Sequence, residues 1–585
     1  MNDDEMKKDA ITEQENIDNL VQEDGIRIGI FICHCGTNIA GWIDVEKVEE
    51  YAKKLKNVIY VKRNLYTCAD DGLSSIRNAI KEHHLNRVIV ASCTPRTHAP
   101  LFKRNCQEAG LNPYLFEFVN IREQCSWVHM NEREKATEKA KGLIRMGVER
   151  AALLEPQVEE EIEVIPSALV IGAGIAGMTA ALSLANQGFT VHMIEKRERI
   201  GGMLNDLNVL FPRMIKASVA IHEFVKKVEN NGRINIYTSS RMIALEGYVG
   251  NYEATIKSGK KEQKLKIGTI ILATGANVYE PKGFYGYGEL DNVITQMELE
   301  GLLKNKKIKG VNDMVMIQCV GARGQDLAYC SKICCSCAIK NAILLKEANP
   351  KVGISILHNG LRVYGVEYEK LYRNAREKGI RFKKYSPEKR PKVVKGDPLA
   401  IKFYHELLGR EVEYRADYVV LSTPLIQQPD GEELSKMLKV PLGQDKFFLE
   451  AHVKLRPLDF ATDGIYLCGT AHAPADIAES VAQAYGAASR AAIPLKNGVI
   501  RAEAITSVID TDKCSQCTTC EWVCPYGAIR KVEIDEKVTK IQVIAASCKG
   551  CGACASVCPE RAISMRNFTD EQLIVQAKAG LVEVV

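Results

Sequence analysis

The sequence predicts a multi-domain α/β protein that ends in a small, cysteine-rich α+β module. Three observations support this fold class. The chain has 585 residues, and one hydrophobic core rarely grows beyond about 250 to 300 residues. Apolar runs of strand length alternate with charged stretches of helical character from about residue 26 to residue 495. Twenty cysteines are present, and eight of them lie between residues 514 and 558.

The composition excludes several classes of protein. Apolar residues make up 46% of the chain and charged residues 26%, and the formal net charge is +5. So small a charge gives no support to a nucleic-acid partner or a membrane surface. The sequence lacks an apolar stretch of about 18 residues, as a membrane span needs, and its acidic amino terminus is unlike a signal peptide. We therefore expect a cytoplasmic protein, in which clustered cysteines indicate metal binding rather than disulfides.

We expect four segments in order. Residues 1–25 form a disordered acidic tail, and residues 26–150 form a small α/β domain that includes the strands Ile28–Ile32 and Arg87–Ala91. A larger α/β region fills residues 151–500, and a charged segment near its start, Val158–Val164, is expected to be a linker. Residues 501–585 contain the cysteine-rich module and a tail.

The clearest motif is a doubled cysteine run near the carboxyl end. Each run reads C-x2-C-x2-C-x3-C-P, the pattern that holds 4Fe-4S clusters in two-cluster ferredoxins. In that arrangement the fourth cysteine of each run serves the other cluster, so Cys558 completes the first set and Cys524 the second. Structural zinc is the alternative. The predicted ligands are Cys514, Cys517, Cys520, Cys524, Cys548, Cys551, Cys554 and Cys558.

A dinucleotide-binding motif opens the large α/β region. The strand Ser167–Ile171 leads into G-x-G-x-x-G at Gly172, Gly174 and Gly177, and a helix follows. A second strand, Thr190–Ile194, ends at Glu195. Such a turn places a pyrophosphate on the helix amino terminus, and the acid binds ribose hydroxyls.

Further glycines favour FAD over NAD at this turn. Gly201-Gly202 and Ala273-Thr274-Gly275 resemble motifs of flavoproteins with two dinucleotide-binding domains, and Asp463–Thr470 resembles their second FAD strand. Thr470 replaces their usual acid, and the helix from about Asp476 is expected to point at the flavin. The predicted FAD-binding residues are Gly172, Gly174, Ile175, Ala176, Gly177, Glu195, Lys196, Gly201, Gly202, Met203, Ala273, Thr274, Gly275, Gly469, Thr470, Asp476 and Ile477.

The region therefore resembles thioredoxin reductase, with FAD halves at about 165–300 and 415–495 and a second Rossmann-like part at about 305–415. Flavoproteins of this type carry a second glycine motif for nicotinamide after the strand expected at Met314–Gln318. Here Cys319, Cys330, Cys334 and Cys335 occur instead. A helical turn would put Cys330 and Cys334 on one face, so we expect another 4Fe-4S cluster near the flavin, with Cys337 spare. Redox-active or buried thiols are the alternative.

Five cysteines of the first domain are candidates for a fourth cluster: Cys33, Cys35, Cys68, Cys93 and Cys125. Cys33 and Cys93 closely follow strands, and the carboxyl ends of parallel strands converge. Four ligands are needed, so either Cys33 or Cys35 is left over; Cys106 is expected to be structural. Scattered free cysteines are the alternative.

Together, Cys33-His-Cys35-Gly36, Cys93-Thr-Pro-Arg-Thr-His98, the run from Asn112 to His129 and the Cys319–Cys335 set resemble the A-type subunit of heterodisulfide reductase over about residues 26–575. The resemblance implies an oxidoreductase with flavin-based electron bifurcation, in which FAD sends one electron to partner subunits of the B and C types and one to ferredoxin. It also implies an electron-input subunit of hydrogenase, formate dehydrogenase or flavin oxidoreductase type, and a homodimer within a larger complex.

Three departures from that family stand out. Val228–Gly268 contains no cysteine, where an inserted ferredoxin is common. Phe211-Pro212-Arg213-Met214 lacks a frequent cysteine pair, and Tyr364–Glu367 lacks a frequent lysine. No catalytic side chain is predicted. Two other functions stay open: a self-contained NAD(P)H-dependent iron-sulfur flavoenzyme, and a redox sensor or scaffold without turnover.

Overall fold

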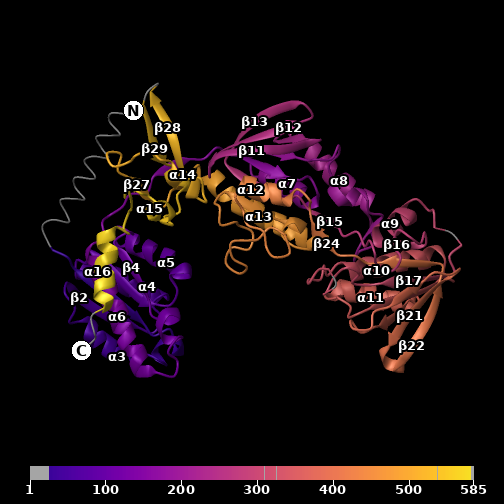
Figure 1. Ribbon diagram of the computed structural model, residues 1–585, viewed down its shortest axis with the longest axis horizontal. Helices are drawn as coiled ribbons and strands as arrows, with labels where there is room; N and C mark the ends of the chain where they lie inside the picture. The colour runs from indigo at the N-terminus through magenta and orange to yellow at the C-terminus, as the bar shows by residue number, and fades with distance from the viewer. Residues whose placement is uncertain (1–24, 309, 325, 536–537, 582–585) are drawn as a thin grey trace. The chain divides into compact units, whose positions relative to one another are not determined.

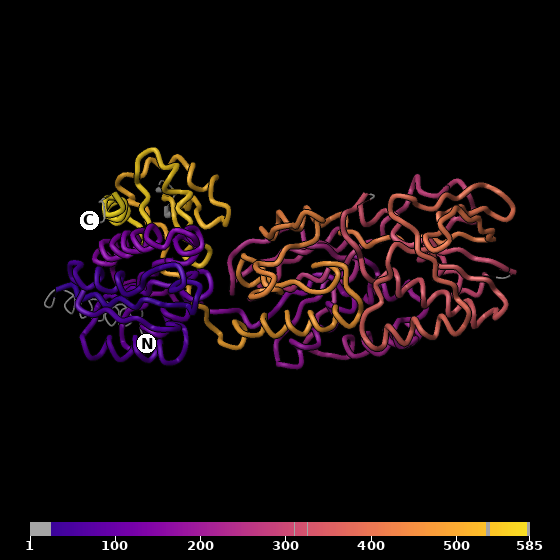
Figure 2. The backbone as a smooth tube through the Cα atoms, turned by 90° about the horizontal axis from the view of Figure 1, so that it is seen from below, coloured from indigo at the N-terminus to yellow at the C-terminus, as the bar shows by residue number. Residues whose placement is uncertain are grey.

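The computed structural model describes residues 25–308, 310–324, 326–535 and 538–581. The expected acidic tail, apart from Gly25, lies outside them. The chain forms two compact units. The first contains residues 1–160 and 502–585, and the second contains residues 161–501. The first α/β domain and the cysteine-rich module thus belong to one unit (indigo and yellow in Figure 2), and the large region is inserted between them in sequence.

The first domain is a parallel sheet with the strand order β2-β1-β3-β4 (Figure 1). Every residue of β1 and β3 is buried, as expected for strands covered on both faces. Chain connections leave β1 and β3 in opposite directions, so their carboxyl ends form a topological switch point. The strands are β1 Ile28–Cys33, β2 Val58–Asn64, β3 Arg87–Ser92 and β4 Phe116–Asn120; the helices are α2 Thr37–Ala40, α3 Val45–Ala52, α4 Asp70–Glu82, α5 Pro95–Glu108 and α6 Arg133–Ala152, with a π-helical turn at Arg122–Ser126.

The cysteine-rich module has two pairs of antiparallel strands and two short helices. β27 pairs with β30, and β28 pairs with β29, all antiparallel. A final helix, α16, packs along α6 of the first domain (Figures 1 and 2). The elements are β27 Ser507–Ile509, α14 Thr519–Val523, β28 Ile529–Asp535, β29 Val538–Val543, α15 Ala553–Ser556, β30 Ile563–Met565 and α16 Asp570–Leu581.

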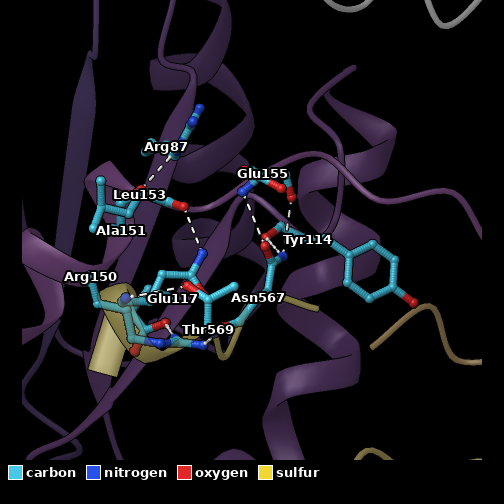
Figure 3. A network of polar contacts seen from close by, with 10 residues as sticks. Arg87, Tyr114, Glu117, Arg150, Ala151, Leu153, Glu155, Asn567 and Thr569 are labelled. Atoms are coloured by element: carbon cyan, nitrogen blue, oxygen red, sulfur yellow. Dashed lines mark hydrogen bonds and ion pairs between the residues drawn. The ribbon is translucent and has the colours of Figure 1, made fainter. Parts of the chain in front are cut away.

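Buried polar contacts join the module to the first domain (Figure 3). Arg150 forms an ion pair with Glu117 and donates to the Asn567 carbonyl at 2.6 Å. The Asn567 amide donates to the Tyr114 carbonyl at 3.2 Å, and its oxygen accepts from the Glu155 amide at 3.0 Å. These contacts lie at the start of β4, which is the end of the sheet opposite its carboxyl edge. They explain why the module does not form a separate unit.

The second unit contains two Rossmann-like sheets. The first has the order β10-β7-β6-β14-β25, all parallel, with its switch point between β6 and β14. Its predicted strands β6 Ser167–Ile171, β7 Thr190–Ile194 and β14 Thr269–Leu272 are found at the expected residues. The remaining elements of this half are α7 Ile175–Asn186, β8 Val209–Leu210, β9 Ile215–Lys216, α8 Ala217–Glu229, β10 Ile234–Tyr237, β11 Ser240–Tyr248, β12 Asn251–Ser258, β13 Lys261–Ile267, β15 Ala276–Val278, β24 Leu425–Gln427, α12 Gly431–Leu438, β25 Ile465–Leu467 and α13 Ile477–Asn497.

The other Rossmann-like sheet has the order β16-β23-β17-β18-β19, again parallel. Its switch point lies between β17 and β23. The elements are β16 Val293–Thr295, α9 Gln296–Lys304, β17 Asp313–Ile317, α10 Cys334–Ala348, β18 Gly353–His358, α11 Val366–Glu377, β19 Arg381–Lys384, β20 Lys392–Val394, β21 Leu399–His405, β22 Arg410–Ala416 and β23 Tyr418–Leu421.

The segment Val158–Val164, which was expected to be a linker, contains a short strand. Within the segment Val158–Val164, β5 Glu161–Glu163 pairs antiparallel with β26 Val499–Arg501, so the two chain crossings run side by side at this point. None of the helices among the described residues is both long and apolar enough to cross a membrane.

Candidate functional site

A cavity opens at the switch point of the first Rossmann-like sheet. Its empty space, with open solvent at the mouth included, is about 1180 Å³. All residues predicted to bind FAD line it except Gly177 and Gly469. The structure therefore brings residues of both predicted FAD halves to one cavity.

The glycines of the first turn differ in what they do. A Cβ on Gly172 would lie 2.4 Å from the Ala273 carbonyl oxygen, and one on Gly177 would lie 1.8 Å from the Gly172 oxygen. These two positions therefore need glycine for packing of the turn and the helix. A Cβ on Gly174 would meet nothing within 4 Å, so this glycine leaves open space at the amino terminus of α7, where a pyrophosphate would bind.

Glu195 is held in place by the backbone. One carboxylate oxygen accepts from the Ala173 amide and the other from the Arg197 amide, both at 2.9 Å. The residue is buried but lines the cavity, so free lone pairs on these oxygens are available to ribose hydroxyls. Lys196 next to it forms an ion pair with Asp430 at 3.1 Å.

Asp476, which lines the second half of the cavity, is the N-cap residue of α13. The Asp476 carboxylate accepts from the Glu479 amide at 2.8 Å at the start of α13, and the Tyr368 hydroxyl donates to its other oxygen. The Thr274 hydroxyl also lines the cavity and is buried without a hydrogen-bond partner. A buried hydroxyl of this kind calls for a partner, which a bound dinucleotide would provide.

The sequence analysis missed a buried ion pair in the wall of the cavity. Lys340 of α10 pairs with Glu300 of α9, and these side chains are 1% and 0% exposed. Glu300 also accepts from the Asn208 amide at 3.1 Å. Burial lowers the pKa of Lys340 to about 7. The sequence feature that could have indicated a buried charged group here is the lysine within the mostly apolar helical run Ala338–Leu345.

Cys319, Cys330, Cys334 and Cys335 gather beside this wall, at the switch point between β17 and β23. Burial raises the pKa of Cys335 to about 11, and the neighbouring thiols of Cys319 and Cys330 add to that rise. The expectation of a helical turn through Cys330 and Cys334 is wrong, because α10 begins at Cys334 and Cys330 lies in the preceding loop. Cys337, expected to be spare, lines the flavin cavity one turn further along α10.

The first domain places Cys33, Cys35, Cys68 and Cys93 together at its switch point. Burial raises the pKa of Cys68 and of Cys93, and the thiols of Cys33 and Cys35 contribute to each shift. Several buried polar atoms at the ends of these strands have no hydrogen-bond partner: His34 Nε2, Asn64 Nδ2, Thr67 Oγ1, Ser92 Oγ and Arg122 Nε. Such a concentration of unpaired donors fits a bound sulfide-rich group.

Cys125 differs from the other four. Its Sγ donates to the Ala136 carbonyl at 3.0 Å inside the hydrophobic core, and the neighbouring charge that affects its pKa is Lys139. The structure therefore sets Cys125 apart, whereas the sequence analysis expected either Cys33 or Cys35 to be left over. Cys106 is fully buried in the same core, as expected for a structural residue.

In the cysteine-rich module, a small cavity is lined by Cys524, Cys548, Cys551 and Cys554. This is the set in which the fourth cysteine of the first run crosses to the second. The two runs are built alike: the Ala528 amide donates to Cys524 Sγ and the Ala562 amide to Cys558 Sγ, each at 3.3 Å. In the other set, burial raises the pKa of Cys520, and the neighbouring thiols of Cys514 and Cys517 also raise it.

Within the described residues, no three His, Cys, Asp or Glu side chains converge on a single metal-ion position. That result is compatible with 4Fe-4S clusters, because each of the four cysteines binds a different iron of the cluster. The fold, the cavity and these cysteine groups together define an iron-sulfur flavoprotein oxidoreductase.

Comparison with known proteins gives the family. The pyridine nucleotide-disulphide oxidoreductase family matches residues 166–490, and the 4Fe-4S dicluster domain matches residues 507–565. The A-type iron-sulfur subunit of the CoB--CoM heterodisulfide reductase of Methanocaldococcus jannaschii is 38% identical over 644 residues, covering 94% of this chain and 97% of the relative. The A-type subunit of the H(2):CoB-CoM heterodisulfide,ferredoxin reductase of Methanothermobacter thermautotrophicus is 37% identical, covering 95% and 98%. The A-type subunit of the H(2)/formate:CoB-CoM heterodisulfide,ferredoxin reductase of Methanococcus maripaludis is 35% identical, covering 94% and 97%.

The chain belongs to the family of A-type heterodisulfide reductase subunits. This confirms the family recognised from the sequence, the predicted α/β fold class and the prediction of an FAD and 4Fe-4S electron-transfer subunit. The alignment of 644 residues is longer than the chain of 585 residues. The Methanocaldococcus relative therefore contains inserted residues that this chain lacks.

Proposed function

We propose that this chain is the flavin-bearing subunit of a heterodisulfide-reductase-like complex, in which electron pairs are divided at FAD between two acceptors. One acceptor has a high potential and lies on partner subunits of the B and C types, and the other is a low-potential ferredoxin. The names of two relatives, those from Methanothermobacter thermautotrophicus and Methanococcus maripaludis, contain both a heterodisulfide and ferredoxin. They differ in the donor, H(2) or H(2)/formate, so we leave the input subunit open among the hydrogenase, formate dehydrogenase and flavin oxidoreductase types.

One observation carries this proposal. The wall of the flavin cavity includes Ile333 and Cys337, and between them lie Cys334 and Cys335 of the cysteine group beside β17. A flavin and an iron-sulfur centre would then be separated by a single turn of α10, which is about 5.4 Å of helix. Such proximity suits the transfer of single electrons, and the cysteine group stands where a nicotinamide motif was expected.

The residue assignments are part of the proposal. Gly174 and the first turn of α7 bind the pyrophosphate, Glu195 binds a ribose, and Thr274 and Asp476 lie along the rest of the cofactor. Four cysteine sets each hold one cluster. They are Cys33/Cys35/Cys68/Cys93, Cys319/Cys330/Cys334/Cys335, Cys514/Cys517/Cys520/Cys558 and Cys524/Cys548/Cys551/Cys554. A homodimer within the larger complex completes the assembly that the family implies.

Bound FAD supplies the ability to exchange electrons either in pairs or singly, and 4Fe-4S centres exchange them singly. The protein positions these cofactors, and a buried ion pair in the cavity wall can hold a proton. Lys340 and Glu300 are both buried in the cavity wall, so they hold a proton in a site from which water is largely excluded. Burial lowers the pKa of Lys340, which favours transfer of this proton from Lys340 to Glu300 within the pair.

Anaerobic purification from the native host, with counts of iron, sulfide and flavin, tests the proposal. We expect roughly 16 iron atoms and one FAD per chain, because each four-cysteine set holds one 4Fe-4S centre. Co-purifying subunits should then couple reduction of a heterodisulfide to reduction of ferredoxin. About eight iron atoms would contradict the two sets outside the carboxyl-terminal module.

The same preparation separates the proposal from its alternatives. Mixing with NADH or NADPH under anaerobic conditions should leave the flavin oxidised, whereas rapid bleaching would indicate a self-contained NAD(P)H-dependent enzyme. A preparation with full iron and flavin that never reduces ferredoxin with its partners would instead indicate a sensor or scaffold.

A further inference from the structure

Two of the cysteine groups each have an arginine beside them. In the first domain, Arg122 Nη1 donates to Cys35 Sγ at 3.9 Å. In the second unit, Arg323 lies in the loop between Cys319 and Cys330, where its amide donates to the Tyr329 carbonyl at 3.1 Å and its side chain is within hydrogen-bond reach of Cys319. By contrast, the sulfur contacts seen in the described part of the carboxyl-terminal module come from neutral groups: the Ala528 and Ala562 amides and the Ser507 and Thr519 hydroxyls.

Both arginines are fixed by other contacts. The Arg122 guanidinium lies over the Trp127 ring at 4.5 Å and pairs with Glu123 at 3.1 Å. Arg323 Nη1 donates to the Asn359 carbonyl at 2.6 Å. Arg122 Nε is also buried without a partner, so this guanidinium still has an N–H for a sulfide. These anchors hold each positive charge against the cysteines rather than leaving it in solvent.

An electron added to a buried iron-sulfur centre brings negative charge into a medium of low dielectric constant, and that is unfavourable. The cysteines concerned are buried, with Cys33 at 3%, Cys93 at 5%, Cys319 at 9% and Cys335 at 5% exposure. A neighbouring guanidinium is charged in both oxidation states and attracts the more negative reduced form. Net charge and hydrogen bonds to sulfur are among the factors that set cluster potentials.

We propose that Arg122 and Arg323 set the reduction potentials of their two clusters, each raising the affinity of its buried centre for one electron. This inference rests on the proposed cluster assignments above and goes beyond them by naming the side chains that keep the buried centres reducible. The step concerned is uptake of one electron by an oxidised 4Fe-4S centre from a reductant in solution. No bond is made or broken.

Glu123 supplies a test of opposite sign. It is the anion paired with Arg122, and it also accepts from the Asn120 side-chain amide at 2.6 Å. Replacing it by glutamine removes the negative charge but conserves the size of the side chain and the acceptor. The positive charge of Arg122 then acts on the cysteines without its counter-charge, so the potential should rise.

The experiment is an anaerobic potentiometric titration of the full-length holoprotein, followed by electron paramagnetic resonance. Variants Cys93→Ser and Cys335→Ser identify which signal belongs to which cluster. We expect Arg122→Gln and Arg323→Gln to lower the electron affinity of their own clusters by at least tenfold, which is 59 mV for a one-electron couple. Arg323→Lys should retain most of the affinity, and Glu123→Gln should shift the first-domain cluster upward.

Arg381 is the matched control for Arg323. It lies at the first residue of β19 and pairs with Asp313 at the start of β17 at 3.8 Å, at the end of the same sheet opposite Cys319. Since strands rise about 3.3 Å per residue, the five residues of β17 separate it from the cysteines by roughly 17 Å. Arg381→Gln should leave every potential unchanged.

The outcomes distinguish two kinds of failure. If the wild type holds no clusters at Cys93 or Cys335, the proposed function fails and this inference with it. If iron and flavin are complete but the glutamine variants leave the midpoint potentials unchanged, only this inference fails. Should Arg122→Gln lose iron, Glu123→Gln still decides the sign at the first-domain cluster, because an unchanged or lower potential in that variant contradicts the proposal. Should Arg323→Gln lose iron, Arg323→Lys decides for the second cluster, because a tenfold or greater loss of electron affinity despite the retained charge contradicts the proposal.

Discussion

Replacing Lys340 by methionine should destabilise the flavin-binding unit, because it leaves the Glu300 carboxylate buried without its cation. Glu300 is 0% exposed, and its remaining contact is the Asn208 amide at 3.1 Å. Breaking a buried ion pair by removing one partner typically costs about 3 to 5 kcal/mol. The surviving hydrogen bond places the expected cost near the lower end, about 3 kcal/mol.

The double variant Lys340→Met/Glu300→Gln is the decisive comparison. Glutamine still accepts from the Asn208 amide, and no buried charge remains, so we expect the double variant to lie within about 1 kcal/mol of the wild type. The two substitutions would then be strongly non-additive, as expected for directly contacting residues.

Thermal release of FAD, followed by flavin fluorescence, is the suitable measurement, since a chain of two compact units does not unfold in one step. A cost of about 3 kcal/mol should lower the release temperature by on the order of 5 °C. If Lys340→Met lowers it no more than the double variant does, the buried pair is not formed in the holoprotein and the reasoning is refuted.

Three further predictions concern other parts of the molecule. Gly174→Ala should abolish FAD binding but leave the circular dichroism of the apoprotein unchanged, because the added Cβ meets no protein atom within 4 Å. Gly177→Ala should change both FAD binding and the circular dichroism, because its Cβ would lie 1.8 Å from the Gly172 oxygen. Cys125→Ser should retain all iron, whereas Cys93→Ser should lose about four iron atoms, those of one cluster; equal losses would return Cys125 to the ligand set. Burial raises the pKa of Glu117 to about 7, above its unfolded value of about 4.3. Its contribution to stability is therefore fully present below about pH 4.3 and lost as the pH rises through about 7, by roughly 4 kcal/mol in all. Glu117→Gln should remove that pH dependence from hydrogen-exchange measurements of the first unit, and an unchanged pH dependence would contradict the shift.

The local elements of the flavin site could be predicted from the sequence because short-range rules determine them. Strands β6, β7 and β14 are found at the predicted residues, since each is a short, mostly apolar run next to a glycine or an acid. The glycines and Glu195 were predictable because a tight turn and a ribose each require a specific residue type. Thr470 and Asp476 could be placed only through the resemblance to other flavoproteins.

Long-range packing could not be predicted in the same way. Nothing in the sequence around Asn567 indicates that it bonds to Tyr114 and Glu155, more than 400 positions away. The pairing of Lys340 with Glu300 is likewise a product of how α10 packs on α9. Cys125 resembles the other candidate ligands of the first domain in sequence, and only the fold shows that its thiol faces the core instead of the other cysteines.

The three sheets nevertheless follow one rule that links sequence to function. In open parallel sheets, ligands bind at the carboxyl edge, where the strand order reverses. Cys33 and Cys93 occupy that position after β1 and β3, Gly172 and Ala273 occupy it after β6 and β14, and Cys319 occupies it after β17. Three copies of one binding geometry thus carry a cysteine group, a dinucleotide cavity and a second cysteine group. Since the third is where a nicotinamide motif was expected, the proposed function has reducing equivalents reach this flavin within its own chain as single electrons passed along α10, and it places any hydride donor on another subunit.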